Sequence, residues 1–324
     1  MSPLVTIAIP TYQRLTYLQT AVESALGQTY PHLDILISQD PTPTGLDPDI
    51  HAWSQALASQ HPQVRYQSNP HNLGLAGNWN AVAAAALGDY IVIIGDDDIL
   101  LPTFVETLVK AAHPGTEVIF ANHFIINSAG VRLVEESHRW TQRYHRDRMP
   151  PGPLDCPECW VWQNAIPMLS ALVKTASVQQ FWFKEDLNTP EIELFLRLAQ
   201  AGAEFIFVPD YLAEFRVHPH SATTTGRGLR NHRLTSYLLP LPVKPEVEPY
   251  KRACLAQLMV NAVSQSLLDG EKEQARAWLN SPYYPPRQKL RPSGLAQRIC
   301  TALPGGTGLD LYQKLHGAKQ ALRP

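Results

Sequence analysis

The sequence predicts an α/β fold, in which a mostly parallel central sheet carries helices on both faces and a smaller helical extension follows. Short β-branched runs alternate with segments of helical spacing between residues 4 and 94. This alternation implies βαβ crossovers, which place parallel strands beneath covering helices. A cluster of prolines then marks a boundary near residue 240, and helical patterns follow it.

The elements of the first hundred residues follow one another regularly. The predicted strands are 4–9, 33–37, 64–67 and 90–94, and the predicted helices are 15–26, 52–58 and 76–87. The third helix is expected to end at Gly88, as helices commonly do at glycine. The run 90–94 is apolar throughout, which is typical of a strand covered on both faces.

The remainder of the chain is less regular. It predicts strands at 117–121 and 204–208, a helix at 191–201, and helices at 250–268 and 272–279. The polar, proline-rich segment 138–157 is expected to be a long loop, which in a compact domain favours a lid or a binding loop. The tail from residue 282 onward is basic and loosely patterned.

Composition excludes several classes of protein. The 324 residues carry a net charge of −2, so the basic excess that marks nucleic-acid binding is missing and no nucleic-acid partner is expected. An apolar share of 44% suffices for a sizeable core. The first ten residues do not resemble a secretory signal and no run is long enough to span a membrane, which favours a cytoplasmic location. In that reducing compartment the four cysteines, including the pair Cys156 and Cys159 in a predicted loop, are expected to be free thiols.

The strongest chemical signal is the triplet Asp96-Asp97-Asp98, which directly follows the apolar strand 90–94 and Gly95. In an open α/β sheet, ligands bind beyond the carboxyl ends of the strands. Adjacent carboxylates repel one another, and a divalent cation cancels that repulsion; oxygen ligands select a hard ion such as Mg²⁺ or Mn²⁺. The alternative is a solvated acidic turn that caps the next helix.

Other polar residues are expected at the same sheet edge. Pro10, Thr11 and Tyr12 follow the first strand, and Asp40 follows the second. The segment from Asn72 and Gly74 to Asn80 opens the helix that leads to the triplet, and helix N-termini favour anionic groups such as phosphate.

Taken together, these segments resemble the family-2 glycosyltransferases. The resemblance runs from residue 4 to about residue 225, and its motifs are Val5-Thr6-Ile7-Ala8-Ile9-Pro10-Thr11-Tyr12, Ser24-Ala25-Leu26-Gly27-Gln28-Thr29-Tyr30, Asn72-Leu73-Gly74 and Gly88-Asp89-Tyr90 through Asp98. The family has the GT-A fold, a nucleotide-sugar-binding sheet with an acidic metal motif. The resemblance implies a catalytic domain at 1–239, with a nucleotide-sugar-binding half at 1–125 and an acceptor-binding half at 126–239. Residues 240–324 form an extension outside it.

The resemblance also implies roles for individual residues. The nucleotide-sugar would contact Pro10, Thr11, Tyr12, Arg14, Asp40, Asn72, Gly74, Asn80, Asp96 and Asp97. Tyr12 would flank the base, and Asp40 would accept a hydrogen bond from a ring N–H, which suits uracil or thymine. Asp97, Asp98 and His218, the last within Phe215-Arg216-Val217-His218-Pro219-His220-Ser221, would hold Mn²⁺ or Mg²⁺ at the donor diphosphate.

The family's general base precedes an apolar helix, and Glu191 occupies that place. There a carboxylate takes the proton of the acceptor hydroxyl as it attacks the anomeric carbon, which inverts the configuration. Glu193, two residues on, is expected to favour the helix N-terminus electrostatically instead. Trp160 and Trp162 could form a platform for a sugar, although tryptophans in an apolar stretch are more often core residues.

These features predict an inverting, metal-dependent hexosyltransferase of polysaccharide synthesis, with a UDP- or dTDP-sugar donor and a glycan or lipid-linked acceptor. The chain departs from the family pattern at Gln39, at Pro41-Thr42 and at Pro190, where an acidic residue, Gly-Ser and an acidic residue are usual. The alternatives are a nucleotidyltransferase of similar fold and a non-catalytic module that binds nucleotide-sugars or glycans. The mildly basic tail suits a peripheral contact with the inner face of a membrane, or is a solvated surface.

Overall fold

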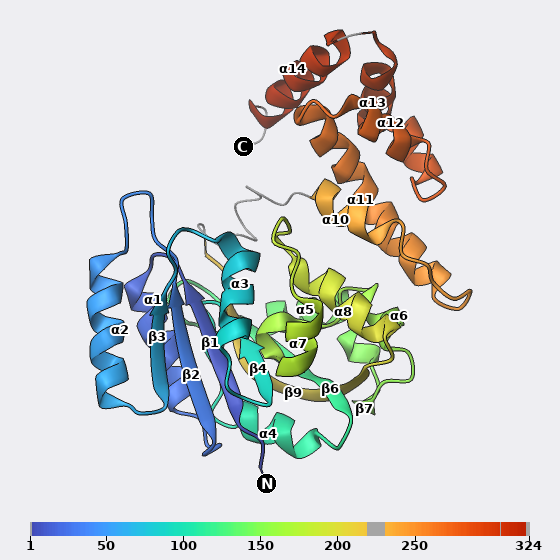
Figure 1. Cartoon of the computed structure of the whole chain (residues 1–324). Helices are drawn as coiled ribbons and strands as arrows, with labels where there is room; N and C mark the ends of the chain where they lie inside the picture. The colour runs from blue at the N-terminus through green and yellow to red at the C-terminus, as the bar shows by residue number, and fades with distance from the viewer. Residues whose placement is uncertain (1, 219–230, 305, 322–324) are drawn as a thin grey trace. The chain divides into compact units, whose positions relative to one another are not determined.

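The computed structural model describes residues 2–218, 231–304 and 306–321 (Figure 1). The chain divides into two compact units, Met1–Arg227 and Gly228–Pro324, which are described separately. The proline cluster that begins at Pro240 lies within the second unit, between its first helix and the first turn of the next.

A single sheet organises the first unit. Its strands are β1 (Val5–Thr11), β2 (Leu33–Gln39), β3 (Val64–Ser68), β4 (Tyr90–Ile93), β5 (Ile99–Leu100), β6 (Thr116–Ile126), β7 (Gly152–Pro153), β8 (Ala171–Lys174) and β9 (Glu204–Arg216). Their order is β3-β2-β1-β4-β8-β6-β9-β5, and β7 pairs with β9. The strands β1 to β4, β6 and β9 share one direction, because only the pairs that involve β5, β7 or β8 are antiparallel. This arrangement confirms the predicted, mostly parallel α/β fold.

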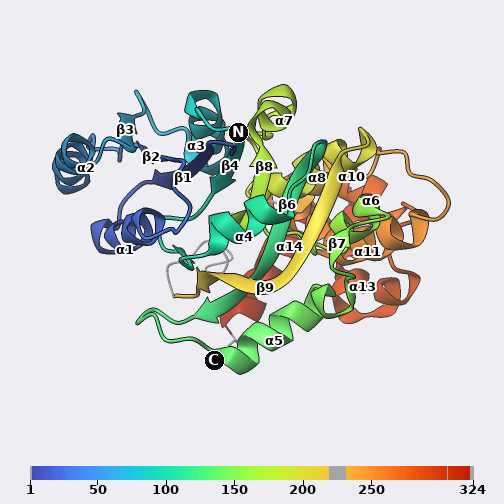
Figure 2. The ribbon, with the colours of Figure 1, turned by 90° about the horizontal axis from the view of Figure 1, so that it is seen from below.

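Helices cover both faces of the sheet. In Figure 2, α1 (Leu15–Leu26) and α3 (Gly74–Ala85) lie on opposite sides of β1 and β2. Helix α1 turns Leu18, Ala21, Val22 and Ala25 toward the alternate side chains Val5, Ile7 and Ile9 of β1, together with residues of α2 (Pro48–Gln60) and α4 (Phe104–Ala111). The alternating residues Thr6 and Ala8 are also fully buried, so strand β1 is covered on both faces.

The strands β6 and β9 run side by side through the rest of the unit (Figure 2) and are longer than the sequence predicts. Their apolar beginnings, 117–121 and 204–208, are the parts that hydrophobic periodicity identified. Beyond Ala121 the register shifts twice and the buried polar residues Asn122 and His123 interrupt the pattern. Polar residues in the interior conceal a strand from a search for apolar runs.

The expected loop at 138–157 is wrong. Most of it belongs to α5 (Val134–Arg143), the short helix η1 (Arg146–Arg148) and β7. The buried side chains of α5 are Ser137 and Thr141, so the helix has no apolar stripe. Ser137 instead ties the helix to the sheet by accepting a hydrogen bond from the backbone N–H of Ile125 at 2.8 Å.

Four further helices belong to the described part of the first unit. They are α6 (Pro157–Val161), η2 (Met168–Ser170), α7 (Thr175–Phe181) and α8 (Pro190–Gln200). The expectation of four free thiols is wrong for one pair, since Cys156 and Cys159 form a disulfide. Cys156 is the N-cap residue of α6 and Cys159 lies one turn on, which brings the two sulfur atoms together. Cys254 and Cys300 are free and buried, as expected.

The second unit is helical. It contains α10 (Asn231–Leu238), α11 (Glu248–Leu268), α12 (Lys272–Leu279), η3 (Pro286–Leu290), α13 (Pro292–Ala302) and α14 (Thr307–Ala321). Its core groups Met259, Val263 and Leu267 of α11 with Trp278 and Tyr284. The tail beyond residue 282 is thus largely helical rather than loosely patterned. None of the helices in the described ranges has the length and apolar character that a membrane crossing requires.

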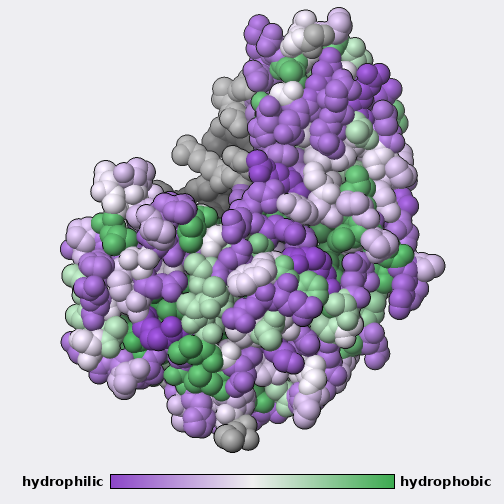
Figure 3. Space-filling model, viewed as in Figure 1, coloured by the Kyte–Doolittle hydropathy of each residue, from purple (hydrophilic) through white to green (hydrophobic). Residues whose placement is uncertain are grey.

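Hydrophilic residues cover most of the face of each unit drawn in Figure 3, and hydrophobic residues appear there in separate small groups.

Candidate active site

A cavity of about 650 Å³ opens at the carboxyl ends of β1, β2 and β4, where the sequence predicts a ligand site. The predicted residues that line it are Pro10, Thr11, Tyr12, Arg14, Asp40, Asn72, Gly74, Asp96, Asp97, Asp98 and Glu191. Two predicted residues, Asn80 and His218, do not line it. The cavity therefore brings the acidic triplet and the expected base together, although almost a hundred residues separate them in the chain.

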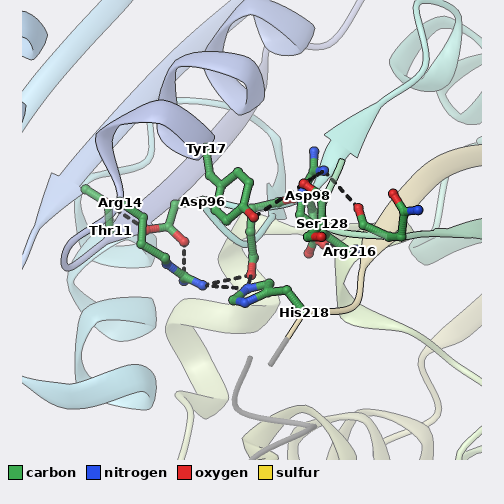
Figure 4. A network of polar contacts seen from close by, with 10 residues as sticks. Thr11, Arg14, Tyr17, Asp96, Asp98, Ser128, Arg216 and His218 are labelled. Atoms are coloured by element: carbon green, nitrogen blue, oxygen red, sulfur yellow. Dashed lines mark hydrogen bonds and ion pairs between the residues drawn. The ribbon is translucent and has the colours of Figure 1, made fainter. Parts of the chain in front are cut away.

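Asp96 is the buried member that fixes the first strand to the triplet. Its Oδ2 accepts a hydrogen bond from the Thr11 hydroxyl at 2.7 Å, and its Oδ1 pairs with Nη2 of Arg14 (Figure 4). Burial raises the pKa of Asp96 to about 6, and the Arg14 charge and the Thr11 hydroxyl oppose that rise. The cation of Arg14 is thus what makes a charged Asp96 tolerable at this depth.

Arg14 and His218 lie next to each other (Figure 4), and Asp97 contacts both of them. Nη1 of Arg14 lies 2.9 Å from Oδ2 of Asp97 and 3.1 Å from Nε2 of His218, and that Nε2 lies 2.9 Å from the same Oδ2. Arg14 precedes α1 with a φ of 121°, a left-handed value that a non-glycine residue adopts only under constraint. The two carboxylates supply that constraint, because they hold the guanidinium in place.

Asp98 is fully inside the protein and is bound to backbone. Its Oδ1 accepts a hydrogen bond from the N–H of Arg216 at 3.0 Å, and burial followed by the charge of Asp97 raises its pKa well above the ordinary value. Gly95 makes the crowding possible. A Cβ at that position would lie 2.7 Å from Oδ1 of Asp97 and 2.9 Å from Oδ2 of Asp98.

These residues fit a divalent cation in part. Among the described residues, no three His, Cys, Asp or Glu side chains form a preformed ligand set. Asp97 and His218 nevertheless converge on one cationic atom, Nη1 of Arg14, at hydrogen-bond distance. A carboxylate oxygen and an imidazole nitrogen are ligands that Mn²⁺ accepts. Asp97 and His218 are therefore two candidate metal ligands, and Nη1 of Arg14 lies within hydrogen-bond distance of both.

Asp40 also lines the cavity and is held by two hydrogen bonds. Its Oδ1 accepts from Asn69 Nδ2 at 2.7 Å, and its Oδ2 accepts from the backbone N–H of Leu73 at 3.2 Å. The turn before α3 is set by Asn72, whose Oδ1 accepts from the N–H of Gly74 at 2.9 Å. Gly74 has a φ of +70°, a value that favours glycine.

The departure at Gln39 has a structural explanation. Gln39 is fully buried, accepts from the Tyr66 hydroxyl at 2.6 Å and donates to the Asp47 carbonyl at 3.1 Å. Asp47 is the N-cap residue of α2. Gln39 therefore holds the start of α2 against the sheet and lies outside the cavity lining.

Asn80 likewise has a structural partner. Its amide donates to the carbonyl of Phe183 at 3.0 Å, and its Oδ1 accepts from the N–H of the same residue at 2.9 Å. These bonds join α3 to the segment after α7. Asn80 supports the wall next to Trp79, which does line the cavity.

Glu191 sits on the first turn of α8, and its burial raises its pKa to about 7. Pro190 is buried at the first position of the helix, where proline is well tolerated. Glu193 faces elsewhere and forms a bidentate ion pair with Arg197, with both N–O distances 2.7 Å. Glu191 therefore faces the cavity, whereas Glu193, on the same helix, is buried in an ion pair.

The remaining wall of the cavity contains residues that sequence reasoning missed. They are chiefly Trp79, His123, Trp140, Tyr144, Arg146 and Asn164. Trp140 and Tyr144 come from α5 and its end, a helix that lacks an apolar stripe, so no sequence pattern pointed to them. Trp160 and Trp162 do not line the cavity, so they form no sugar platform there. Trp162 is a core residue, which is the more common role of tryptophan in an apolar stretch. Pro219, His220 and Ser221 of the His218 motif lie outside the described residues.

The fold and the acidic site together define a GT-A glycosyltransferase domain. Two solved structures share the fold. The mannosyltransferase PcManGT from Pyrobaculum calidifontis, in complex with GDP-Man and Mn²⁺, has a TM-score of 0.59 at 18% identity and covers 97% of this chain and 86% of its own. Residues 1–349 of S. aureus TarS, in complex with UDP-GlcNAc, have a TM-score of 0.60 at 14% identity and cover 98% and 92%.

Sequence comparison identifies the family. Residues 6–166 match glycosyl transferase family 2, and this part of the chain belongs to that family. The chondroitin synthase of Pasteurella multocida is 38% identical over 108 residues, which are 33% of this chain and 11% of that protein. A GalNAc(5)-diNAcBac-PP-undecaprenol beta-1,3-glucosyltransferase of Campylobacter jejuni is 28% identical over 124 residues, 38% of this chain and 39% of its own. The alignments thus span well under two thirds of these relatives.

Proposed function

We propose that this protein transfers a hexose or related sugar from a UDP- or dTDP-sugar to a hydroxyl of a glycan or lipid-linked acceptor, with inversion at the anomeric carbon. The observation that carries the proposal is the shared cavity, in which the triplet at the end of β4 and the carboxyl group of Glu191 face the same space. In this proposal residues 1–125 bind the donor, residues 126–239 bind the acceptor, and residues 240–324 form the extension.

Asp40 is the proposed recognition group for the base. Each of its oxygens accepts one hydrogen bond from the protein, and a carboxylate oxygen has two acceptor sites. The carboxylate can therefore also accept the ring N–H of uracil or thymine. Tyr12, 38% exposed at the cavity, offers a face for that base.

Mn²⁺ or Mg²⁺ is the proposed cofactor, held by Asp97 and His218 with Asp98 beside them. When bound, the ion supplies positive charge that stabilises the departing diphosphate. In the structure Arg14 supplies the positive charge at this point, and we propose that it turns to the diphosphate as the donor binds.

Glu191 is the proposed general base. The acceptor oxygen forms a bond to the anomeric carbon while the bond from that carbon to the diphosphate oxygen breaks. The acceptor proton moves to Glu191, and the diphosphate leaves with the bonding electron pair. A pKa of about 7 suits a base that must accept a proton near neutral pH and release it afterwards.

The second unit has features of a peripheral membrane contact. On and beside α13, Leu290, Leu295 and Ile299 are 74%, 42% and 55% exposed. Arg291 and Arg298 are exposed next to them. Apolar and basic side chains on one helix suit the headgroup region of an anionic membrane, and we propose that this face binds there, with the enzyme on the cytoplasmic side.

Calorimetric titration of UDP, dTDP and GDP, each with and without Mn²⁺, tests the donor proposal. We expect a uridine or thymidine diphosphate to bind more tightly with Mn²⁺, and Asp97→Asn to remove the gain. Asp155→Asn, an exposed aspartate outside the cavity, is the control and should titrate like the wild type. Equal binding with and without metal would overturn the metal assignment. Turnover of nucleoside triphosphates with release of pyrophosphate would favour a nucleotidyltransferase instead.

A further inference from the structure

Arg146, in the cavity wall, is a buried arginine that forms no ion pair with a carboxylate of the described residues. Arg146 is 3% exposed and lines the cavity. Its Nε donates to Oδ1 of Asn122 at 2.9 Å and its Nη1 donates to the carbonyl of Ala165 at 3.2 Å. Its Nη2 has no hydrogen-bond partner in the described part of the chain.

The positive charges of several other arginines in the first unit are balanced by carboxylates. Arg14, Arg65, Arg132 and Arg197 have more exposed side chains, between 19% and 44%, and each contacts a carboxylate. Arg216 is 4% exposed, and its guanidinium donates to the backbone carbonyls of Asp97, Asn127 and Ser128. Arg146 differs from these arginines because, within the described ranges, it has only neutral acceptors and its buried Nη2 has no partner. A buried cation without an anion is costly, so this arrangement indicates a partner that arrives from outside the chain.

The side chains around Arg146 suit a sugar that carries a negatively charged group. Its guanidinium carbon lies 5.6 Å from the centre of the Tyr144 ring, and the Trp140 ring lies 5.8 Å from that of Tyr144. His123 also lines the cavity, and its buried Nδ1 has no partner among the described residues. Burial and the nearby Arg146 hold the pKa of His123 well below its ordinary value, so the imidazole is neutral and adds no second charge. Aromatic faces and a few polar groups are the usual walls of a small-molecule site.

The location favours the acceptor over the donor. Arg146, Trp140 and Tyr144 belong to the chain segment between β6 and β8, and the donor residues precede β5. The proposed base, Glu191, belongs to the later part of the chain as well. We therefore propose that the acceptor is anionic, and that Arg146 binds a carboxylate or phosphate group on it while Trp140 and Tyr144 contact the sugar. This inference rests on the proposed function, because it specifies the substrate of that site.

The test compares matched acceptor probes by titration into protein saturated with UDP and Mn²⁺. The probes are cellobiose and cellobiuronic acid, which differ by a carboxylate, and glucose and glucose 6-phosphate, which differ by a phosphate. We expect one anionic probe to bind at least tenfold more tightly than its neutral partner. Arg146→Gln should reduce that affinity roughly 10- to 100-fold and leave the neutral probe within about twofold. The two pairs also show which anion the site accepts.

Arg148→Gln is the matched control, since Arg148 lies on the same short helix with a side chain that is 76% exposed. It should behave like the wild type. Arg146→Lys keeps the charge without the planar fork, and we expect an intermediate affinity. UDP affinity is measured without any acceptor, so an unchanged value shows that a variant is folded. The same measurement tests the proposed donor site separately from the proposed anionic acceptor. The inference is overturned if neither anionic probe binds better than its neutral partner, or if Arg146→Gln and Arg148→Gln have the same effect.

Discussion

Nη1 of Arg14 lies 2.9 Å from Oδ2 of Asp97, at the point where Nε2 of His218 also approaches. A guanidinium nitrogen thus occupies the position between two groups that can ligate a metal. A divalent cation bound at the proposed site would compete with Arg14 for the Asp97 carboxylate, and the structure shows the arginine in contact with it.

Arg14→Gln should raise the affinity for Mn²⁺ in the absence of nucleotide by about tenfold, because a charge-assisted hydrogen bond no longer opposes the ion. Electron paramagnetic resonance of free Mn²⁺ measures this directly. Arg139→Gln, which removes an exposed arginine paired with Glu136, is the control. If Mn²⁺ binds the Arg14 variant no more tightly than the control, Arg14 does not occupy the metal position.

Gly95→Ala should displace the carboxylates of Asp97 and Asp98, since the new methyl group would lie within 3 Å of an oxygen of each. We expect metal-dependent binding of UDP to weaken by about tenfold or more, together with a lower melting temperature, as is usual for overpacking. Unchanged metal-dependent UDP affinity in this variant would contradict the site as described.

Asp40→Asn should reduce UDP affinity by about tenfold, the effect of losing one hydrogen bond to a charged group. A nucleotide with a methylated ring nitrogen distinguishes this cause from general damage. The wild type should prefer UDP over 3-methyl-UDP, whereas the variant should bind the two alike. If the wild type binds UDP and 3-methyl-UDP equally well, Asp40 does not accept a hydrogen bond from the ring N–H.

Glu191 should give the pH profile of transfer its acidic limb. Since the base acts as a carboxylate and its pKa is raised to about 7, kcat/KM should rise with pH below about 7 and level off above it. Rates of nucleotide release across pH 5 to 9 with buffers of constant ionic strength measure this limb. A limb near the ordinary glutamate pKa, about 4.3, would assign the proton transfer to another group.

Glu193→Gln is expected to have the opposite phenotype to a change at Glu191. It breaks a buried ion pair with Arg197 at 2.7 Å, which typically costs about 3 to 5 kcal/mol of unfolding free energy. The folded fraction should retain its rate, because Glu193 lies outside the cavity lining. Denaturant unfolding and rates per folded molecule separate the two quantities, and a lost rate at full stability would refute this assignment.

The proposed donor side of the site could be predicted from the sequence because its residues follow buried strands directly. Apolar runs locate β1, β2 and β4, and the topology of a parallel sheet then brings Thr11, Asp40 and Asp96 to one edge. The resemblance to a known family added Glu191, which no local pattern places near the triplet.

The proposed acceptor side could not be predicted in this way. Helix α5 faces the sheet with Ser137 and Thr141 and contains few apolar residues, so a search for apolar residues at helical spacing does not detect it. Arg146 is a charged residue in a polar segment, and only the fold reveals that it is buried. The partners of Asn80 and Gln39 are backbone atoms and side chains of distant segments, which sequence spacing does not show.

The most direct test of glycosyl transfer measures donor binding and nucleoside diphosphate release in the same Glu191→Gln preparation. With UDP- or dTDP-sugar, Mn²⁺ and a mixture of glycan acceptors, the wild type should release diphosphate in step with glycosylated product. The variant should bind the donor with wild-type affinity while its release rate falls roughly 10²- to 10⁴-fold. Release at the wild-type rate by Glu191→Gln, or donor binding without product in the wild type, would contradict the proposed mechanism.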